Sequence, residues 1–318
     1  MLQRFFIAFL FLFPLAGTAK QPVNDKQLRM YQDTLHKMDS AVFRGKDQQK
    51  QAVNRKFMTC LRKALNTEGA FDFPFDSLKT IGKLTAPDNS FRIFNWNIPN
   101  DDGTYTYYGF LMVNQAKALT GKKGRMVKDQ YVIYELIDKS NEIRNPELTV
   151  CSPEKWYGAL YYKIIKTSDK DKNYYTLLGW DGNNQVTWKK VIDVLTFDKQ
   201  GNPIFGEKNL FQRGRRSSKR VIFEFRAEMV MTLHWDEGNN RIVYDHLAPE
   251  VAGAEGMYQY YSQTFNYDAF VWKKGEWKEM DDVRPNNPSD PKDKEYHAPE
   301  GDQKPKPNPA PKPPGGRH

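Results

Sequence analysis

Side chains alternate between apolar and polar along most of the chain, and this two-residue period constrains the fold more than any other feature. From about residue 78 to 280, short aromatic and β-branched runs carry the period, as in Phe91–Ile98. Turn sequences of Asp, Asn and Gly, such as Asn100–Gly103 and Asp181–Asn184, separate many of the runs. Gly and Asn supply the positive φ that tight hairpins need. Because no helical pattern that could connect parallel strands lies between the runs, the sequence predicts antiparallel hairpins.

The predicted fold class is mainly β, an antiparallel meander of about 11–12 short strands preceded by a helical hairpin. Three hairpins, Phe91–Gly103, Tyr174–Asn184 and Met231–Asn240, each combine alternating residues, one Trp and a polar turn. Their spacing is unequal, so a sandwich, an open barrel and an irregular propeller all remain open. The predicted strands are Phe91–Ile98, Tyr105–Val113, Tyr131–Ile137, Trp156–Lys166, Tyr174–Trp180, Thr187–Phe197, Val221–Phe225, Met229–Trp235, Arg241–Tyr244, Met257–Tyr261, Tyr267–Trp272 and Trp277–Glu279.

Two helical stripes precede the β region. Apolar residues recur at intervals of three and four, which predicts two amphipathic helices, the first capped by Asn24 and ended by Gly45. A hairpin of two short helices can pack on its own domain or form a coiled coil with a partner; we predict the first arrangement. The stripes are Leu28, Tyr31, Leu35, Met38 and Val42, then Val53, Phe57, Cys60, Leu61, Ala64 and Leu65.

The two ends of the chain predict export and a disordered tail. An apolar run from Phe5 to Ala16, followed by small residues to Ala19, is typical of a secretory signal peptide over residues 1–19. We therefore expect a mature chain from about Lys20, without a transmembrane segment, in the periplasm or outside the cell. Residues 284–318 hold ten of the 19 prolines and almost no apolar residue, which predicts disorder. Residues 20–70 form the helical hairpin and 71–283 the β domain.

Cys60 and Cys151 are the two cysteines. An oxidising destination permits one disulfide between them, and the alternative is two small buried thiols.

The sequence contains no common catalytic or cofactor motif. It has no nucleophile elbow, phosphate loop, dinucleotide glycine fingerprint or paired metal-ligand motif, so we predict no cofactor and no metal. His234, Asp245 and His246 could meet in one hairpin and form an acid/base site. Adjacent side chains of a strand point to opposite faces, however, and this favours a structural role for the histidines.

Binding residues are suggested by aromatic and basic side chains. Aromatics form 14% of the chain, and exposed rings can stack on sugars or peptides; Trp96, Trp180, Tyr108 and Tyr261 are the candidates. Core packing is the alternative for each ring. A basic cluster that includes Arg213, Arg215, Arg216 and Arg220 could bind an anion or be an ordinary charged loop. Because the remaining cations are interleaved with 39 acidic residues, a nucleic-acid partner is not expected.

Four segments are similar to a family of exported proteins of Bacteroidota. They are Phe91–Asn97, Tyr134–Ser140, Tyr175–Asn183 and Val243–Leu247. The resemblance covers residues 70 to 280 or so and implies export into a Gram-negative envelope; that family has no assigned activity, so it implies no catalytic residue.

Two functional hypotheses follow. The first is a non-enzymatic envelope or secreted module that binds a cell-envelope polysaccharide or a protein through an aromatic β surface. The second is a hydrolase with its site near His234, Asp245 and His246.

Overall fold

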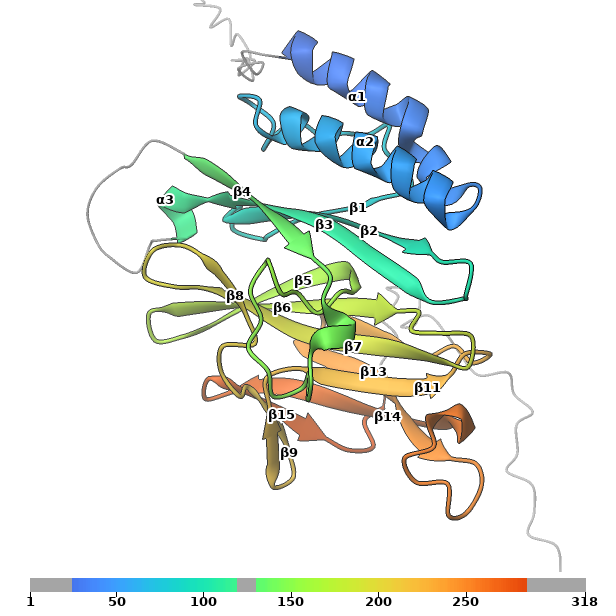
Figure 1. Ribbon diagram of the computed structural model, residues 1–318. Helices are drawn as coiled ribbons and strands as arrows, with labels where there is room; N and C mark the ends of the chain where they lie inside the picture. Colours follow the sequence, from blue (N-terminus) through green and yellow to red (C-terminus); the bar gives the residue numbers. More distant parts are fainter. Residues whose placement is uncertain (1–24, 119–129, 285–318) are drawn as a thin grey trace, which may run out of the picture. The chain divides into compact units, whose positions relative to one another are not determined.

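Two helices and three β-sheets lie in successive layers (Figure 1). The computed structural model describes residues 25–118 and 130–284. The predicted signal peptide, the Asn24 cap and the predicted tail beyond Arg284 lie outside these residues. The described β and helical elements belong to a compact unit that ends at Val283.

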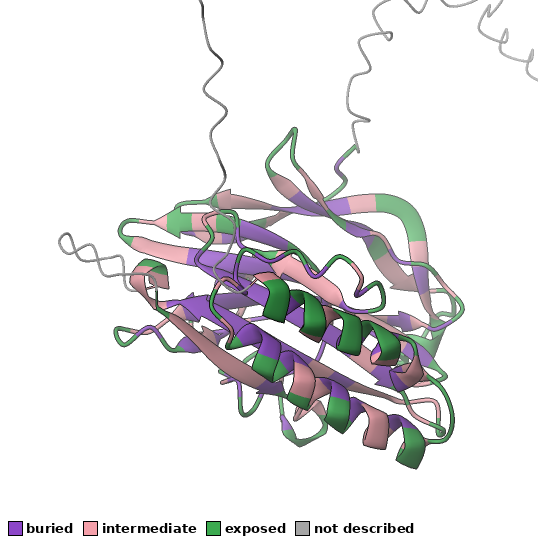
Figure 2. Cartoon of the chain, turned by 90° about the horizontal axis from the view of Figure 1, so that it is seen from above, coloured by how far each residue is buried: buried purple, intermediate pink, exposed green. Residues whose placement is uncertain are grey.

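The helical layer consists of α1 (Asp25–Asp39), the short 3-10 helix η1 (Ala41–Phe43) and α2 (Asp47–Leu65). Their apolar stripes face inward, and Figure 2 shows the exposed faces of both helices turned away from the sheets. Phe57 of α2 meets Trp96 of the first sheet edge-to-face, with ring centroids 5.3 Å apart. The helical hairpin therefore packs on its own domain, as predicted.

The first sheet has the strand order β1-β2-β3-β4 and lies directly under the helices. Its outer face, including Phe94 and Phe110, contributes to the core shared with α1 and α2. Its inner face, including Phe91 and Leu111, packs on the second sheet. The strands are β1 (Gly82–Thr85), β2 (Phe91–Pro99), β3 (Tyr105–Asn114) and β4 (Tyr131–Ile137).

The second sheet is covered on both faces. Its order is β11-β7-β6-β5, with β8 added on β7. Adjacent residues Tyr174 and Tyr175 are both buried because one ring enters the core with the third sheet and the other the core with the first. The strands are β5 (Leu160–Asp169), β6 (Lys172–Asp181), β7 (Thr187–Phe197), β8 (Pro203–Phe205) and β11 (Val221–Arg226).

The third sheet has the order β10-β9-β15-β14-β13-β12. All its pairs are antiparallel except β15 with β9. Its inner face, with Tyr244, Phe270 and Trp277, closes the core against the second sheet. The strands are β9 (Phe211–Arg213), β10 (Arg216–Ser218), β12 (Leu233–Asp236), β13 (Arg241–Pro249), β14 (Tyr261–Lys273) and β15 (Glu276–Met280).

The mainly β class with N-terminal helices is confirmed, and the described residues form no closed barrel. The three look-alike hairpins lie one in each sheet. Met257–Tyr261 was predicted as a strand but is mostly the 3-10 helix η3 (Tyr258–Tyr260), and Met229–Trp235 is a strand only from Leu233. Strands β1, β8, β9 and β10 were missed because three or four residues are too few to show a period. Two short helices were also not predicted, α3 (Gln115–Ala118) and η2 (Ser140–Glu142).

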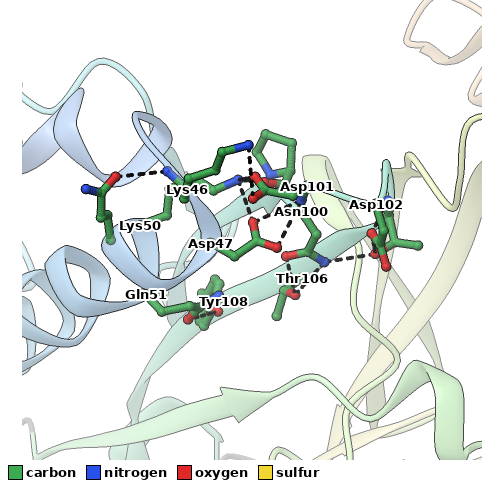
Figure 3. Close-up of polar contacts among 12 residues, drawn as sticks. Lys46, Asp47, Lys50, Gln51, Asn100, Asp101, Asp102, Thr106 and Tyr108 are labelled. Atoms are coloured by element: carbon green, nitrogen blue, oxygen red, sulfur yellow. Dashed lines mark hydrogen bonds and ion pairs between the residues drawn. The ribbon is translucent and has the colours of Figure 1, made fainter.

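A polar cluster fastens the start of α2 to the β2–β3 turn (Figure 3). The Asp47 carboxylate accepts a hydrogen bond from the backbone N–H of Asp101 at 3.0 Å and lies 2.8 Å from Lys50 Nζ. Lys50, although nearly buried, also donates to the Pro99 carbonyl. These contacts hold the helical layer at the turn that carries Asp102. In the part of the chain described here, neither helix has the length and apolar content that crossing a bilayer requires.

Candidate functional site

Two of the four aromatic candidates lie beneath the helices. Trp96 is fully buried and donates through Nε1 to Asn54 Oδ1 at 2.9 Å. The prediction of a ligand-stacking role for Trp96 is therefore wrong, because the helical layer covers its ring. Tyr108 is half-buried and donates to Gln51 Oε1 at 2.7 Å. Trp180 and Tyr261 are half-buried in the second and third sheets.

The four arginines of the predicted anion site are not one surface. Arg220 is fully buried, with Nη2 2.9 Å from Asp193 Oδ2, so its assignment to an exposed anion site is wrong. Arg213 lies 2.9 Å from Glu279, whereas Arg215 and Arg216 are exposed at the β9–β10 turn. The cluster predicted as a charged connection is a short hairpin with one core residue.

The two cysteines are free thiols, so the disulfide alternative is wrong. Cys60 contacts the core under the helices, and Cys151 belongs to the core between the first and second sheets. The first sheet separates the two sulfur atoms.

The predicted His234, Asp245 and His246 constellation does not assemble. His234 is exposed on β12, while Asp245 is buried and accepts from the Thr232 backbone N–H at 2.7 Å. His246 Nδ1 instead lies 2.6 Å from Asp268 Oδ2 on β14. Within the described ranges, no hydrogen bond joins any two members of the predicted trio, and no group of His, Cys, Asp and Glu side chains could hold a metal.

A hollow of about 480 Å³ opens where turns of several layers meet. We call it the turn hollow. Its wall combines the β2–β3 turn, the β6–β7 turn, β11 and η3, and it offers amide, hydroxyl and carboxylate groups with one aliphatic side chain. The lining residues are Asp102, Asn184, Gln185, Val186, Thr187, Glu224 and Gln259.

A buried carboxylate fixes the turn that lines this hollow. Asp181, the last residue of β6, accepts from Tyr107 Oη at 3.0 Å and from the Asn183 backbone N–H at 2.8 Å. The Gly182 N–H donates in turn to Tyr107 Oη at 2.7 Å. Burial raises the pKa of Asp181, although Lys189 at 3.9 Å opposes the shift. Because its groups bind one another, this network positions the turn.

Exposed apolar side chains are frequent in the segments that adjoin the turn hollow and in the neighbouring β13–β14 connection and start of β14. Thirteen large apolar side chains are exposed in the described residues, and seven belong to this end of the fold. Soluble proteins rarely leave such side chains together in water. We call the seven the apolar rim: Val186, Val230, Val251, Met257, Tyr258, Tyr260 and Phe265.

Hydrogen bonds tie the segments of the apolar rim to one another. The Ala227 N–H donates to the Val186 carbonyl at 3.0 Å, and η3 packs against β11. The Gln263 amide, oriented so that its nitrogen meets acceptors, donates to the Val230 carbonyl and to Asp245 Oδ2. The rim residues are thus held on neighbouring strands and turns, with Tyr258 in ring contact with Tyr261.

Phe265 stands at the centre of a bulge in β14. Gln263 pairs with Leu247 and Tyr267 with Asp245, so Thr264, Phe265 and Asn266 face the single residue His246. Phe265 has φ +64° and is 85% exposed. A bulky residue in this left-handed region is strained, and its ring gains nothing from burial. Both costs fall on one side chain, and such outliers cluster at binding and switch sites.

No protein-family model, curated protein or solved structure matches the chain. The function of the turn hollow and the apolar rim is therefore inferred from their geometry and chemistry.

Sequence reasoning missed most of the apolar rim. The sequence predicted a strand over Met257–Tyr261. Its aromatic candidate Trp96 lies in the core and not on a binding surface. The available signal was Val251-Ala252-Gly253-Ala254-Glu255-Gly256, a glycine-rich segment that interrupts the alternation just before Met257.

Proposed function

We propose that the protein is a non-enzymatic exported module that docks a protein partner through the apolar rim. The observation that carries the proposal is Phe265, which is strained and almost wholly exposed at the centre of a bulge. An aromatic ring that projects from a rigid strand is the kind of anchor that dominates binding energy when a partner supplies a pocket.

The chemistry of the rim favours a protein over a polysaccharide. Val186, Val230 and Val251 are aliphatic, and Met257 is flexible and polarizable. Sugars are held by aromatic faces combined with polar groups, whereas aliphatic side chains suit a protein surface. Asn184, Gln185 and Gln259 of the turn hollow would then supply polar contacts beside the apolar anchor.

Export is part of the same proposal. The signal-peptide pattern and the similarity of four segments to exported proteins of Bacteroidota both favour the cell envelope or the exterior.

The hydrolase alternative has weaker support. His246 and Asp268 form a histidine–carboxylate pair, but a hydrolase also needs a nucleophile or activated water beside the imidazole. We expect His246→Ala to change stability and no catalytic activity.

Site-specific photocrosslinking in the producing cells tests the docking proposal. A photoreactive phenylalanine analogue is placed at Tyr260, a half-exposed rim position, and at Met30 on the helical layer as a matched exposed control. We expect a discrete protein adduct from position 260 and none of the same mass from position 30.

The adduct must also depend on the anchor. Phe265→Asp, introduced beside the crosslinker at position 260, should abolish the adduct because a charge cannot enter an apolar pocket. The proposal would be contradicted if the adduct still formed with Phe265→Asp. It would also be contradicted if the purified protein bound a glycan array equally well with and without this substitution.

A further inference from the structure

A second surface lies where α1 and α2 meet, separate from the apolar rim. Two residues of α1 and six of α2 line a groove of about 530 Å³, which we call the helical groove. Past Tyr31 and Lys63 it continues into another hollow of about 470 Å³. The α2 residues form one helical face because their spacing follows three and four residues. The lining residues are Tyr31, Thr34, Ala52, Arg55, Lys56, Thr59, Cys60 and Lys63.

Among the described residues to Val283, the excess of positive charge lies on this layer. Residues 25–66 contain ten Lys and Arg against four Asp and Glu, whereas the other described residues to Val283 contain 25 against 29. Two cations of α2 are already committed, since Arg62 pairs with Glu135 and Lys50 with Asp47. Arg55, Lys56 and Lys63 are exposed at the groove, and among the described side chains none of the three forms an ion pair.

The floor of the groove is apolar between these cations. Tyr31, Ala52 and the half-buried Cys60 provide it. A purely polar anion would leave this floor exposed to water. An anionic amphiphile satisfies both parts, because its acidic group meets the cations and its hydrocarbon covers the floor.

We propose that the helical groove binds an anionic lipid, with the headgroup phosphate against Arg55, Lys56 and Lys63 and the adjoining acyl chain over Tyr31, Ala52 and Cys60. The exposed helical layer thereby attaches the protein to a negatively charged membrane, with the groove at the boundary between headgroups and acyl chains. The attraction weakens as salt is added, since each cation acts through screened charge.

The two thiols provide the readout. Full-length mature protein is mixed with phosphatidylcholine vesicles that contain or lack phosphatidylglycerol. Co-flotation measures binding, and mass spectrometry follows alkylation of Cys60, with the buried Cys151 as the internal reference. We expect binding and slower Cys60 alkylation only with phosphatidylglycerol, and reversal of both by salt.

Matched variants assign the effect to the groove. Arg55→Gln, Lys56→Gln and Lys63→Gln together should weaken vesicle binding roughly 100-fold, from about 1 kcal/mol for each cation at a membrane surface. Lys208→Gln, Arg215→Gln and Arg216→Gln remove the same charge from the third-sheet side and should leave binding almost unchanged.

Three results would overturn the assignment. Equal losses in the two triple variants would mean diffuse attraction to the whole protein. Slowing of Cys60 alkylation by inorganic phosphate alone would mean a site for a free anion. Protection of Cys60 by polyglutamate without any vesicle binding would mean an acidic polymer as the occupant.

Discussion

At the scale of single residues, the most constrained group is the buried pair Arg220–Asp193. Both side chains are fully buried, and the oxygen of Asp193 that faces Arg220 also accepts from Tyr161 Oη at 3.0 Å. The Arg220 guanidinium further donates to the Pro146 carbonyl at 2.5 Å. Burial alone would lower the pKa of Arg220, but the contributions of Asp193, Cys151 and Tyr161 together raise it. The pair connects β7, the start of β11 and the segment around Pro146.

Arg220→Met should lower the free energy of unfolding by about 3–5 kcal/mol, because it leaves the Asp193 carboxylate buried without its counter-charge. The double variant Arg220→Met/Asp193→Leu should recover part of the loss, since no unpaired charge remains. Urea unfolding followed by circular dichroism measures both. A double variant that is less stable than Arg220→Met would contradict this account.

Asp88 gives the fold an acid-sensitive contact between the first and second sheets. Its carboxylate accepts from Tyr175 Oη at 2.8 Å and lies 3.0 Å from Lys166 Nζ. Burial acts to raise the pKa of Asp88, but hydrogen bonds from Ser90, Lys166 and Tyr175 together have the larger effect, and the pKa is lowered below its usual value. Because the pKa of Asp88 is lower in the folded state than in the unfolded chain, its ionised carboxylate stabilises the fold above about pH 4, the pKa in the unfolded chain. This contribution is lost as the pH falls through the pKa of the folded state.

Asp88→Asn should therefore reduce stability at pH 7 and make the acid limb of the stability curve shallower. Urea midpoints measured between neutral and strongly acid pH test this expectation. The exposed Asp33→Asn serves as the control and should run parallel to the wild type. A wild type and an Asp88→Asn variant that differ equally at every pH would exclude the linkage.

At the scale of elements, the helical layer is bound by large aromatic contacts as well as by the polar cluster of Figure 3. Phe57→Ala removes a fully buried ring that packs on Trp96, so the free energy of unfolding should fall by about 3–5 kcal/mol. Thermal and urea unfolding measure the change. Met30→Ala on the exposed face should change stability by no more than about 0.5 kcal/mol. A loss of less than 1 kcal/mol or so in Phe57→Ala would mean that the helices unfold separately from the sheets.

The β14 bulge should trade stability for binding. Phe265→Asn places a residue that tolerates the left-handed region at φ +64°, and should stabilise the fold by about 1 kcal/mol while removing the ring. Phe265→Ala removes the same ring but keeps the strain, so it is the matched control and should bring a smaller gain. Differential scanning calorimetry measures both. If Phe265→Asn were less stable than the wild type, the claim of strain at this position would fail.

The sequence predicted the regular strands well, but it predicted the bulged strand β14 only from Tyr267 and predicted the site poorly. Strands such as β2 and β7 show several repeats of the two-residue period, and their predicted bounds agree with the structure to within one residue. The adjacent rings Tyr174 and Tyr175 allow either a sheet covered on both faces or one ring outside the core, and only the packing of three layers decides between them. Trp96 and Arg220 were misplaced because burial depends on contacts with residues far away in the sequence. Phe265 escaped notice because its exposure follows from a bulge whose register depends on β13.

At the scale of the whole molecule, the predicted signal peptide places both proposed surfaces in the cell envelope or outside the cell. When the full-length chain is produced in a Gram-negative host, we expect removal of residues 1–19 and a mature protein that begins near Lys20. Intact-mass measurement and N-terminal sequencing of the envelope and medium fractions test this. Replacement of Leu10 and Leu12 by Arg, which interrupts the apolar run, should leave the unprocessed chain inside the cell. An unprocessed wild-type chain confined to the cytoplasm would rule out the envelope role.

The second sheet, covered on both faces, also constrains how the chain can fold during its synthesis. The helices and the first sheet precede it in sequence, whereas most of the third sheet follows it. Because the chain is made from its N-terminus, the first sheet can cover one face of the second sheet early. The other face stays exposed to water until β13–β15 have been made. During that interval the intermediate exposes one apolar face of the second sheet to water. Premature termination before β13 should therefore yield aggregates rather than a smaller folded protein.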